Sequence, residues 1–301
     1  MYAVGSEGIW RGERPLRILD LCTGTGCISL LLHSILVPYF PKVQIVGVDI
    51  STQALDLARE NLAHNIAKGN LAPRASDEVH FVQADMLKEL HSETDTTSSN
   101  AGTDIPDLDT VLSQFSPDSK WDVIISNPPY IAPESYNNGT TKRSVRLYEP
   151  KLALVPPPVT TLSEHPITPQ ERLERKDRSS LNLTSNENAA RLRGDSFYPR
   201  IIGLAVRYHA SLTVVECGDL NQALRVRNLM QQCGRTHRNI NRKLYRTMAA
   251  EWLFYEPEDD VHVPLPSLLH LAEKQEREVN YDAWKGSVAV IMTRETIRGK
   301  D

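Results

Sequence analysis

Arg17-Ile18-Leu19-Asp20-Leu21 and the turn after it, Cys22-Thr23-Gly24-Thr25-Gly26, decide the fold of this 301-residue chain. The first five residues predict a buried strand, because they form a short, mostly apolar run before a turn. Gly24 and Gly26 let the backbone turn tightly and approach a ligand closely. An apolar helix is expected directly afterwards, over residues 27–36. A strand, a glycine-rich turn and a helix in this order are typical of open α/β sheets, whose ligands bind beyond the carboxyl ends of the strands.

Short apolar runs and stretches with helical spacing continue to alternate along the chain. Further strands are expected over residues 43–48, 79–82, 121–126, 211–216 and 286–293, and further helices over 52–65, 197–209 and 219–232. The last strand could pair with residues 251–255 or with the region of residue 279. Strands separated by helices of this length form a parallel sheet with right-handed crossovers.

Two polar segments interrupt this alternation. Residues 91–119 are rich in Ser, Thr and Asp, and residues 156–195 begin with three prolines and are rich in Glu, Arg, Ser and Asn. Segments of this composition bury little apolar surface, and long segments without regular structure lie at the surface. We predict one domain over residues 1–301 that carries two long, flexible surface insertions.

The composition excludes several classes of partner. The formal net charge is -4, whereas proteins that bind nucleic acid through phosphate contacts are usually basic, so we do not expect a nucleic acid partner. No apolar run reaches the roughly 18 residues needed to cross a bilayer, so we expect no membrane contact. The four cysteines show no C-x-x-C spacing and the histidines no H-E-x-x-H arrangement, so we predict no metal site.

The loop Asn127-Pro128-Pro129-Tyr130 follows the apolar run Val123-Ile124-Ile125-Ser126. Two prolines have fixed φ and no N–H, so the backbone there is stiff and offers only acceptors. Asn127 adds a side-chain carbonyl and Tyr130 a flat ring. These groups suit a planar NH2 group whose two hydrogens must both be held, as methylation of an amide or an aromatic amine requires. The alternative is a loop that merely ends the strand.

Three acidic residues, Asp20, Asp49 and Asp85, follow three successive predicted strands. A carboxylate at the end of the second strand can accept from both hydroxyls of a ribose, and Asp85, with Met86 beside it, can accept from an adenine amino group. Each could instead cap a helix. Their common place at strand ends favours a nucleotide-like ligand. A dinucleotide turn would need glycine where Ser29 stands, which disfavours a dehydrogenase.

Four segments occur in this order: Asp20-Leu21-Cys22-Thr23-Gly24-Thr25-Gly26, Gly47-Val48-Asp49-Ile50-Ser51, Ser126-Asn127-Pro128-Pro129-Tyr130-Ile131 and Val145-Arg146-Leu147-Tyr148-Glu149-Pro150-Lys151-Leu152-Ala153-Leu154. Together they resemble the HemK/PrmC family of glutamine-N5 methyltransferases, which modify the Gly-Gly-Gln motif of class I peptide-chain release factors. The resemblance covers about residues 16–218 apart from the two polar segments. The loop at Asn127 is shared with adenine-N6 and guanine-N2 methyltransferases. The segment that begins at Glu149-Pro150 narrows the resemblance to the HemK/PrmC family.

The resemblance implies a doubly wound, mostly parallel, seven-stranded Rossmann-like methyltransferase sheet whose last strand is antiparallel. It implies S-adenosylmethionine as cofactor and a class I release factor as protein substrate. The implied cofactor-binding residues are Asp20, Cys22, Thr23, Gly24, Gly26, Asp49, Ile50, Asp85, Met86 and Asn127. The implied substrate-binding residues are Asn127, Pro128, Pro129, Tyr130, Glu149 and Pro150, and the catalytic ones are Asn127, Pro128 and Tyr130.

Two departures from the family pattern stand out. Cys22 occupies a position where the family usually has glycine, and we expect the turn to survive if φ there is negative. The family also carries a helical N-terminal domain and a Pro-Arg-x-x-Thr-Glu linker. The roughly sixteen residues before the first strand show neither, so we predict that this substrate-binding domain is absent.

Two other functions stay open at this point. An RNA or DNA base methyltransferase would present an adenine or guanine amine to the same loop, but it would need stacking aromatics and a basic approach surface. A truncated, inactive relative would still bind the cofactor. The Ser-, Asp- and Pro-rich insertions suggest a eukaryotic chain, which favours the mitochondrion over the cytoplasm. We expect a monomer.

Overall fold

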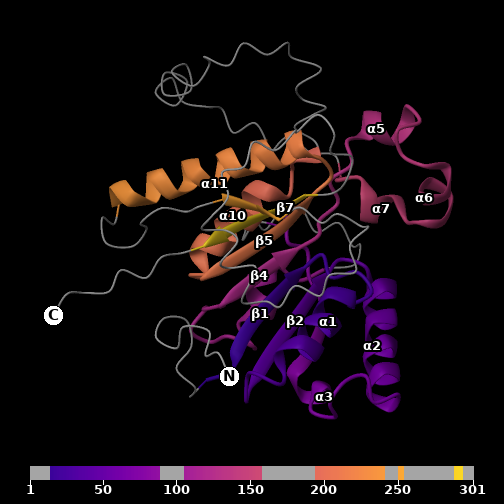
Figure 1. Ribbon diagram of the computed structural model, residues 1–301, viewed down its shortest axis with the longest axis vertical. Coiled ribbons are helices and arrows are strands. Elements are labelled where there is room, and N and C mark those ends of the chain that lie inside the picture. The colour runs from indigo at the N-terminus through magenta and orange to yellow at the C-terminus, as the bar shows by residue number, and fades with distance from the viewer. Residues whose placement is uncertain (1–13, 89–104, 158–193, 241–249, 254–287, 294–301) are drawn as a thin grey trace, which may run out of the picture. The chain divides into compact units, whose positions relative to one another are not determined.

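The computed structural model describes residues 14–88, 105–157, 194–240, 250–253 and 288–293 (Figure 1). The chain divides into two compact units. One comprises residues 1–128 and 200–301, and the other comprises residues 129–199. No helix in these described ranges is long and apolar enough to cross a membrane.

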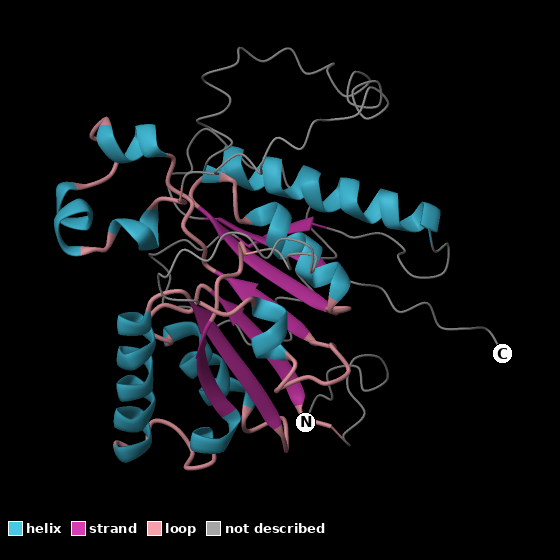
Figure 2. Cartoon of the chain, turned by 180° about the vertical axis from the view of Figure 1, so that it is seen from behind, coloured by secondary structure: helices cyan, strands magenta, loops and turns pink. Residues whose placement is uncertain are grey.

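One sheet dominates the first unit, and Figure 2 shows its strands in magenta. Within the described residues it has seven strands in the order β3-β2-β1-β4-β5-β7-β6. Neighbours from β3 to β5 are parallel, and β7 is antiparallel to both β5 and β6. The strands are β1 (Leu16–Leu21), β2 (Val43–Asp49), β3 (Val79–Gln83), β4 (Val123–Ser126), β5 (Leu212–Cys217), β6 (Ala250–Leu253) and β7 (Val288–Thr293). The predicted α/β fold, with a mostly parallel sheet and an antiparallel last strand, is confirmed.

The strand order reverses between β1 and β4, because the chain first builds outward through β2 and β3 and then returns to the other side of β1. In open α/β sheets, ligands bind at such a switch point, beyond the carboxyl ends of the strands. The helices that connect the strands are α1 (Cys27–Leu36), α2 (Thr52–Ala67), α3 (Ala75–Glu78), α4 (Leu108–Leu112), α10 (Tyr198–Arg207) and α11 (Leu220–Ile240).

A buried cluster between the first three strands and helices α1 and α2 fixes the turn after β1. Ile18, Ile45 and Phe81 contribute from three neighbouring strands to this cluster. A Cβ at Gly26 would lie 2.6 Å from the Phe81 ring, and a Cβ at Gly47 would lie 2.7 Å from it. Any larger residue at either place would collide with the ring, so the packed core holds the turn close to the sheet.

Helix α4 corrects the predicted extent of the first surface insertion. Leu108 and Leu112 are 0% and 2% exposed, and Tyr208 donates a hydrogen bond to the Asp109 carboxylate. The prediction is therefore wrong for this part of residues 91–119, because the apolar side chains of one short helix pack into the first unit. Residues 91–104 lie outside the described residues, as do residues 158–193 of the second predicted insertion.

The second unit contains three short helices, α5 (Pro133–Asn137), α6 (Arg143–Tyr148) and α7 (Lys151–Leu154). The Ile131 N–H donates to the Leu154 carbonyl at 2.8 Å, so the segment after Tyr130 lies against the end of α7. The segments Pro129-Tyr130 and Glu149-Pro150 both belong to this unit. The expectation of a single domain over residues 1–301 stays a prediction.

Candidate functional site

The ends of four parallel strands meet at one edge of the sheet in the first unit. Cys22, Asp49, Asp85 and Asn127 all lie along this edge, because each ends or follows one of the strands β1 to β4. The register that aligns them pairs Leu21 with Val48, Leu21 with Ser126, and Asp49 with Gln83. The structure thus brings predicted cofactor residues together with Asn127, the first residue of the loop Asn127-Pro128-Pro129-Tyr130, which we call the acceptor loop.

Asp49 holds the glycine turn in place. Its Oδ2 accepts the Gly24 N–H at 2.9 Å, and its Oδ1 accepts the Ser51 N–H at 2.9 Å. The cap of α2 is Ser51, whose side chain accepts the Ala54 N–H, so Asp49 is not the capping residue. A carboxylate has about four lone-pair sites, so both oxygens can still accept from the hydroxyls of a ligand.

Open space lies above the turn at Gly24. The residue has φ 56°, and no atom lies within 4 Å of the place where a Cβ would stand. A second support comes from α2, where Asn61 donates from Nδ2 to the Thr25 carbonyl at 3.0 Å. Hydrogen bonds from Asp49 and Asn61 fix this backbone, and the open space at Gly24 permits the close approach of a ligand.

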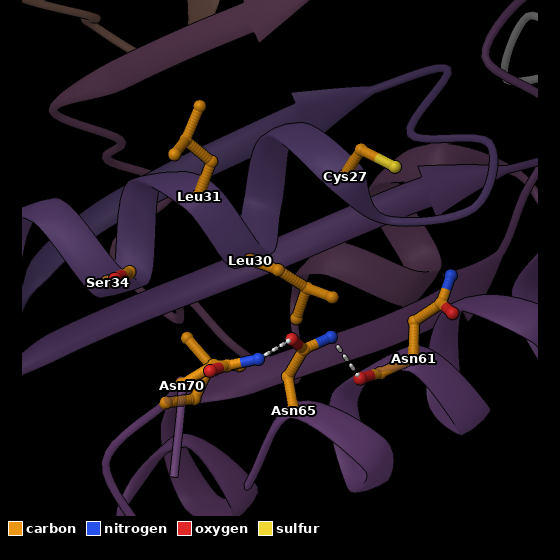
Figure 3. A pocket seen from close by; sticks show the side chains of 8 residues that line it. Cys27, Leu30, Leu31, Ser34, Asn61, Asn65 and Asn70 are labelled. Atoms are coloured by element: carbon orange, nitrogen blue, oxygen red, sulfur yellow. Dashed lines mark hydrogen bonds between the residues drawn. The ribbon is translucent and has the colours of Figure 1, made fainter. Parts of the chain in front are cut away.

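The groove in Figure 3 lies between α1 and α2 and is separate from the strand ends. Its asparagines bond one another: Asn65 Nδ2 donates to the Asn61 carbonyl at 2.8 Å, and Asn70 Nδ2 donates to Asn65 Oδ1 at 3.0 Å. These bonds join α2 to the segment after it. We assign the groove this structural role.

Cys22 has φ 59°, so the turn forms although the negative φ that we set as the condition for it is not met. An L-residue in the left-handed region costs about 1–2 kcal/mol, and only surrounding contacts can hold it there. Here the Thr23 N–H donates to the Val48 carbonyl at 2.9 Å, and the Gly26 N–H donates to the Thr23 carbonyl at 3.0 Å. Burial raises the pKa of the Cys22 thiol, and Asp49 and Asp20 add to this effect. Cys22 is therefore a neutral thiol.

Asp20 is fully buried and has one unpaired oxygen. Thr23 and Ser29 each donate a hydroxyl hydrogen bond to Oδ2 at 2.7 Å, whereas Oδ1 is buried and has no partner among the described residues. Burial raises the pKa of this carboxyl to about 6. An unpaired buried carboxylate oxygen favours a positively charged ligand group, which would supply the missing partner. Ser29 was missed as a site residue, although its hydroxyl helps to hold Asp20.

The other predicted cofactor residues in the first unit also lie near the strand ends. Asp85 is half-buried, and its Oδ1 accepts the Leu87 N–H at 2.8 Å. Met86 is buried, with its Sδ 3.5 Å from the Cys22 Sγ. The Ile50 carbonyl accepts a hydrogen bond from the Gln83 side chain at 2.9 Å.

The acceptor loop is divided between the two units. Asn127 and Pro128 belong to the first unit, where Asn127 is exposed and Pro128 is buried. The remaining predicted substrate residues belong to the second unit, where Pro129 is buried and Tyr130 is half-buried. Glu149 and Pro150 are exposed there. Among the described residues, no group of three or more His, Cys, Asp or Glu is arranged to hold a metal ion.

A mostly parallel sheet with a switch point, a glycine turn and carboxylates at successive strand ends defines the class of Rossmann-like folds. Within that class, residues 13–138 match the family model described as "Methyltransferase domain".

The chain is similar to named glutamine methyltransferases. It is 38% identical over 143 residues to "Probable MRF1 mitochondrial N(5)-glutamine methyltransferase mtq1" of Schizosaccharomyces pombe, a match that covers 47% of this chain and 36% of that one. It is 32% identical over 158 residues to "Release factor glutamine methyltransferase" of Chlorobaculum tepidum, covering 52% and 41%. It is 33% identical over 137 residues to "Ribosomal protein uL3 glutamine methyltransferase" of Francisella tularensis, covering 46% and 31%.

The predicted resemblance to release factor glutamine methyltransferases is confirmed. The matches span between 31% and 41% of the length of these three relatives.

Proposed function

We propose that this chain is an S-adenosylmethionine-dependent methyltransferase whose acceptor is the side-chain amide nitrogen (N5) of a glutamine. The acceptor glutamine would be that of the Gly-Gly-Gln motif in a class I peptide-chain release factor. One observation carries the proposal: Asn127 lies exposed at the end of β4, beside the glycine turn that ends β1. The names of the related proteins support the choice of glutamine over a nucleobase.

The residues at the strand ends fit this cofactor. Asp49 can accept from ribose hydroxyls, the unpaired Asp20 oxygen suits a cationic group, and the open space at Gly24 admits a ligand next to the backbone. The remaining residues that would hold the cofactor are Cys22, Thr23, Gly26, Ile50, Asp85 and Met86. When bound, the cofactor supplies a methyl group activated by a sulfonium.

Catalysis would rest on positioning. Asn127 Oδ1 would accept one N–H of the substrate amide and the Pro128 carbonyl the other, while Tyr130 would pack against the amide plane. Because both hydrogens are held, the nitrogen lone pair faces the methyl donor, and such orientation can contribute several kcal/mol. Positive charge moves onto the amide during transfer, so acceptors already in place favour the transition state. The methylated amide is a strong acid and loses its proton to water without a protein base.

The test is transfer of labelled methyl from S-adenosylmethionine to three acceptors: a class I release factor, the same factor with Gln→Ala in its Gly-Gly-Gln motif, and total RNA. We expect label only in the intact release factor. Label in RNA would instead establish a base methyltransferase. Cofactor binding without transfer to any acceptor would establish an inactive relative.

A second protein acceptor follows from the similarity to a ribosomal protein uL3 methyltransferase. Its glutamine offers the same amide chemistry, so the assay includes a uL3 protein as a fourth acceptor. Label in uL3 but not in the release factor would change the proposed substrate and leave the proposed chemistry intact.

We also propose that the chain acts in the mitochondrion as a monomer. Two yeast relatives are named as mitochondrial proteins, while other relatives are bacterial. Fractionation of cells that express the tagged full-length gene product would test the compartment, and light scattering of the purified protein would test the monomer.

A further inference from the structure

The acceptor loop begins at Asn127, whose side chain must be placed accurately in the proposed function. Strand β4 ends at Ser126, and Asn127 follows. Pro128 and Pro129 have no N–H, so neither can extend the ladder of hydrogen bonds with a donor. The Asn127 side chain is exposed and makes no hydrogen bond within the described residues. Its position therefore depends on the anchor that precedes it.

Ser126 provides that anchor. Its hydroxyl donates to the Leu21 carbonyl at 2.8 Å, and the residue is 1% exposed. Leu21 and Ser126 are also the last pair in the register of β1 with β4. Leu21 immediately precedes the turn that starts at Cys22, while Ser126 immediately precedes Asn127. One buried hydrogen bond thus joins the last residue before the cofactor turn to the last residue before the acceptor loop.

The contacts continue from this bond into the cofactor site. The Ser126 hydroxyl lies close to the Cys22 thiol, which in turn lies 3.5 Å from the Met86 Sδ. Met86 is tied through its carbonyl to Arg200 Nε at 2.9 Å. Ser126 therefore lies next to the turn at Cys22, whereas Met86 has a separate support from Arg200.

We propose that Ser126 is a positioning residue, whose hydroxyl sets the place of Asn127 relative to the turn at Cys22. This inference rests on the proposed function, since it concerns the geometry of the same transfer. Ser126 touches neither reacting group in this account, because its effect passes through Asn127.

The neighbouring strand β5 offers a matched control. Thr213 is also 1% exposed and also carries a buried hydroxyl, but its Oγ1 has no hydrogen-bond partner among the described residues. It pairs with Ile124 in the interior of β4, away from the strand end. Thr213→Val removes a buried hydroxyl from the same sheet without removing a bond between strand ends.

The experiment compares Ser126→Ala, Ser126→Thr and Thr213→Val with the unmodified chain. In Ser126→Ala we expect kcat for the release factor to fall about 10- to 100-fold, because small misplacements cost that much, while the Kd for S-adenosylmethionine by calorimetry changes less than about threefold. Ser126→Thr keeps the hydroxyl and should recover most of kcat. Thr213→Val should match the unmodified chain.

A second readout does not require turnover. Protein labelled with 15N-asparagine gives a side-chain NH2 signal for Asn127, which Asn127→Asp identifies by its loss. We expect this signal to shift or broaden in Ser126→Ala and to stay in place in Thr213→Val. An unmoved signal together with unchanged kcat would overturn the positioning role. If the unmodified chain transfers no methyl to any acceptor, the proposed function fails, but the asparagine signal still decides the role of Ser126.

Discussion

Asp49, at the end of β2, accepts a hydrogen bond from the backbone N–H of Gly24 at 2.9 Å. This bond reaches from one strand end to the turn after the neighbouring strand. The acid that suits a ribose therefore also shapes the loop that would run beside the rest of the cofactor. Its second oxygen is held by the Ser51 N–H, so the carboxylate cannot rotate freely. Ligand binding and loop geometry thus depend on a single side chain.

Replacing Asp49 should chiefly weaken cofactor binding. Asp49→Ala removes the acceptor for ribose hydroxyls and frees the Gly24 N–H. Hydrogen bonds to charged groups contribute about 1.5–3 kcal/mol, so we expect the Kd for S-adenosylmethionine to rise about 10- to 100-fold. Calorimetry measures this directly. Asp56→Ala is the control, because the Asp56 side chain is 70% exposed on α2. An unchanged Kd in Asp49→Ala would remove Asp49 from the cofactor site.

The left-handed backbone of Cys22 predicts which of two variants at this position is the more stable. Cys22→Ala and Cys22→Gly both remove the sulfur, but only glycine relieves the strain of a positive φ. We expect the glycine variant to be more stable than the alanine variant by about 1 kcal/mol, measured as the free energy of unfolding in urea. At a negative φ the order would reverse, since glycine costs about 0.5–1 kcal/mol relative to alanine. A less stable glycine variant would therefore contradict the observed backbone.

Much of the fold could be predicted from the sequence, because the signals that set it are local. The helix over residues 27–36 was placed at its observed bounds, since a glycine turn starts it and an apolar run continues it. The strand ends at Leu21 and Ser126 were equally clear from turns and prolines. Helix α4 was missed because polar residues dominate the surrounding composition, although the spacing of Leu108, Val111 and Leu112 fits one helical face.

The features of the site that escaped prediction depend on distant contacts. The φ of Cys22 is held by the bond from Thr23 to Val48 on another strand. The unpaired Asp20 oxygen arises because two hydroxyls, from Thr23 and from Ser29 on α1, both bond the other oxygen. Such arrangements require the packed sheet. The residue types at the strand ends predicted which acidic residues lie at this edge of the sheet, but not which hydrogen bonds each of them makes.

Asn127 should affect transfer without affecting the cofactor. Its exposed side chain makes no hydrogen bond in the described part of the chain, so Asn127→Ala removes no structural contact. We expect S-adenosylmethionine to bind with a nearly normal Kd, while methyl transfer to the release factor falls about 100-fold or more. Single-turnover rates with labelled cofactor measure the transfer step. Unimpaired transfer would refute the proposed grip on the substrate amide.

Asp20 predicts a dependence of stability on pH. Burial raises its pKa from 3.8 to about 6, so the folded chain holds this proton more tightly than the unfolded chain does. The buried site favours the neutral form of the Asp20 carboxyl. The resulting contribution to the free energy of unfolding is fully present below about pH 4. It is lost as the pH rises from about 4 to about 6, by up to about 3 kcal/mol. The groups that face it are Thr23, Ser29, Cys22 and Asp49, none of which is a cation.

Asp20→Asn tests this prediction, because an amide stays neutral at every pH. In the absence of cofactor, we expect the stability of Asp20→Asn relative to the unmodified chain to increase between pH 4 and pH 7, measured by urea unfolding at each pH. The same variant should bind S-adenosylmethionine more weakly, since it lacks the charge that a cationic group would meet. Asp56→Asn on the surface controls for general effects of removing a carboxylate. A stability difference that stays flat from pH 4 to pH 7 would show that Asp20 is ionised throughout and that its buried oxygen has a partner.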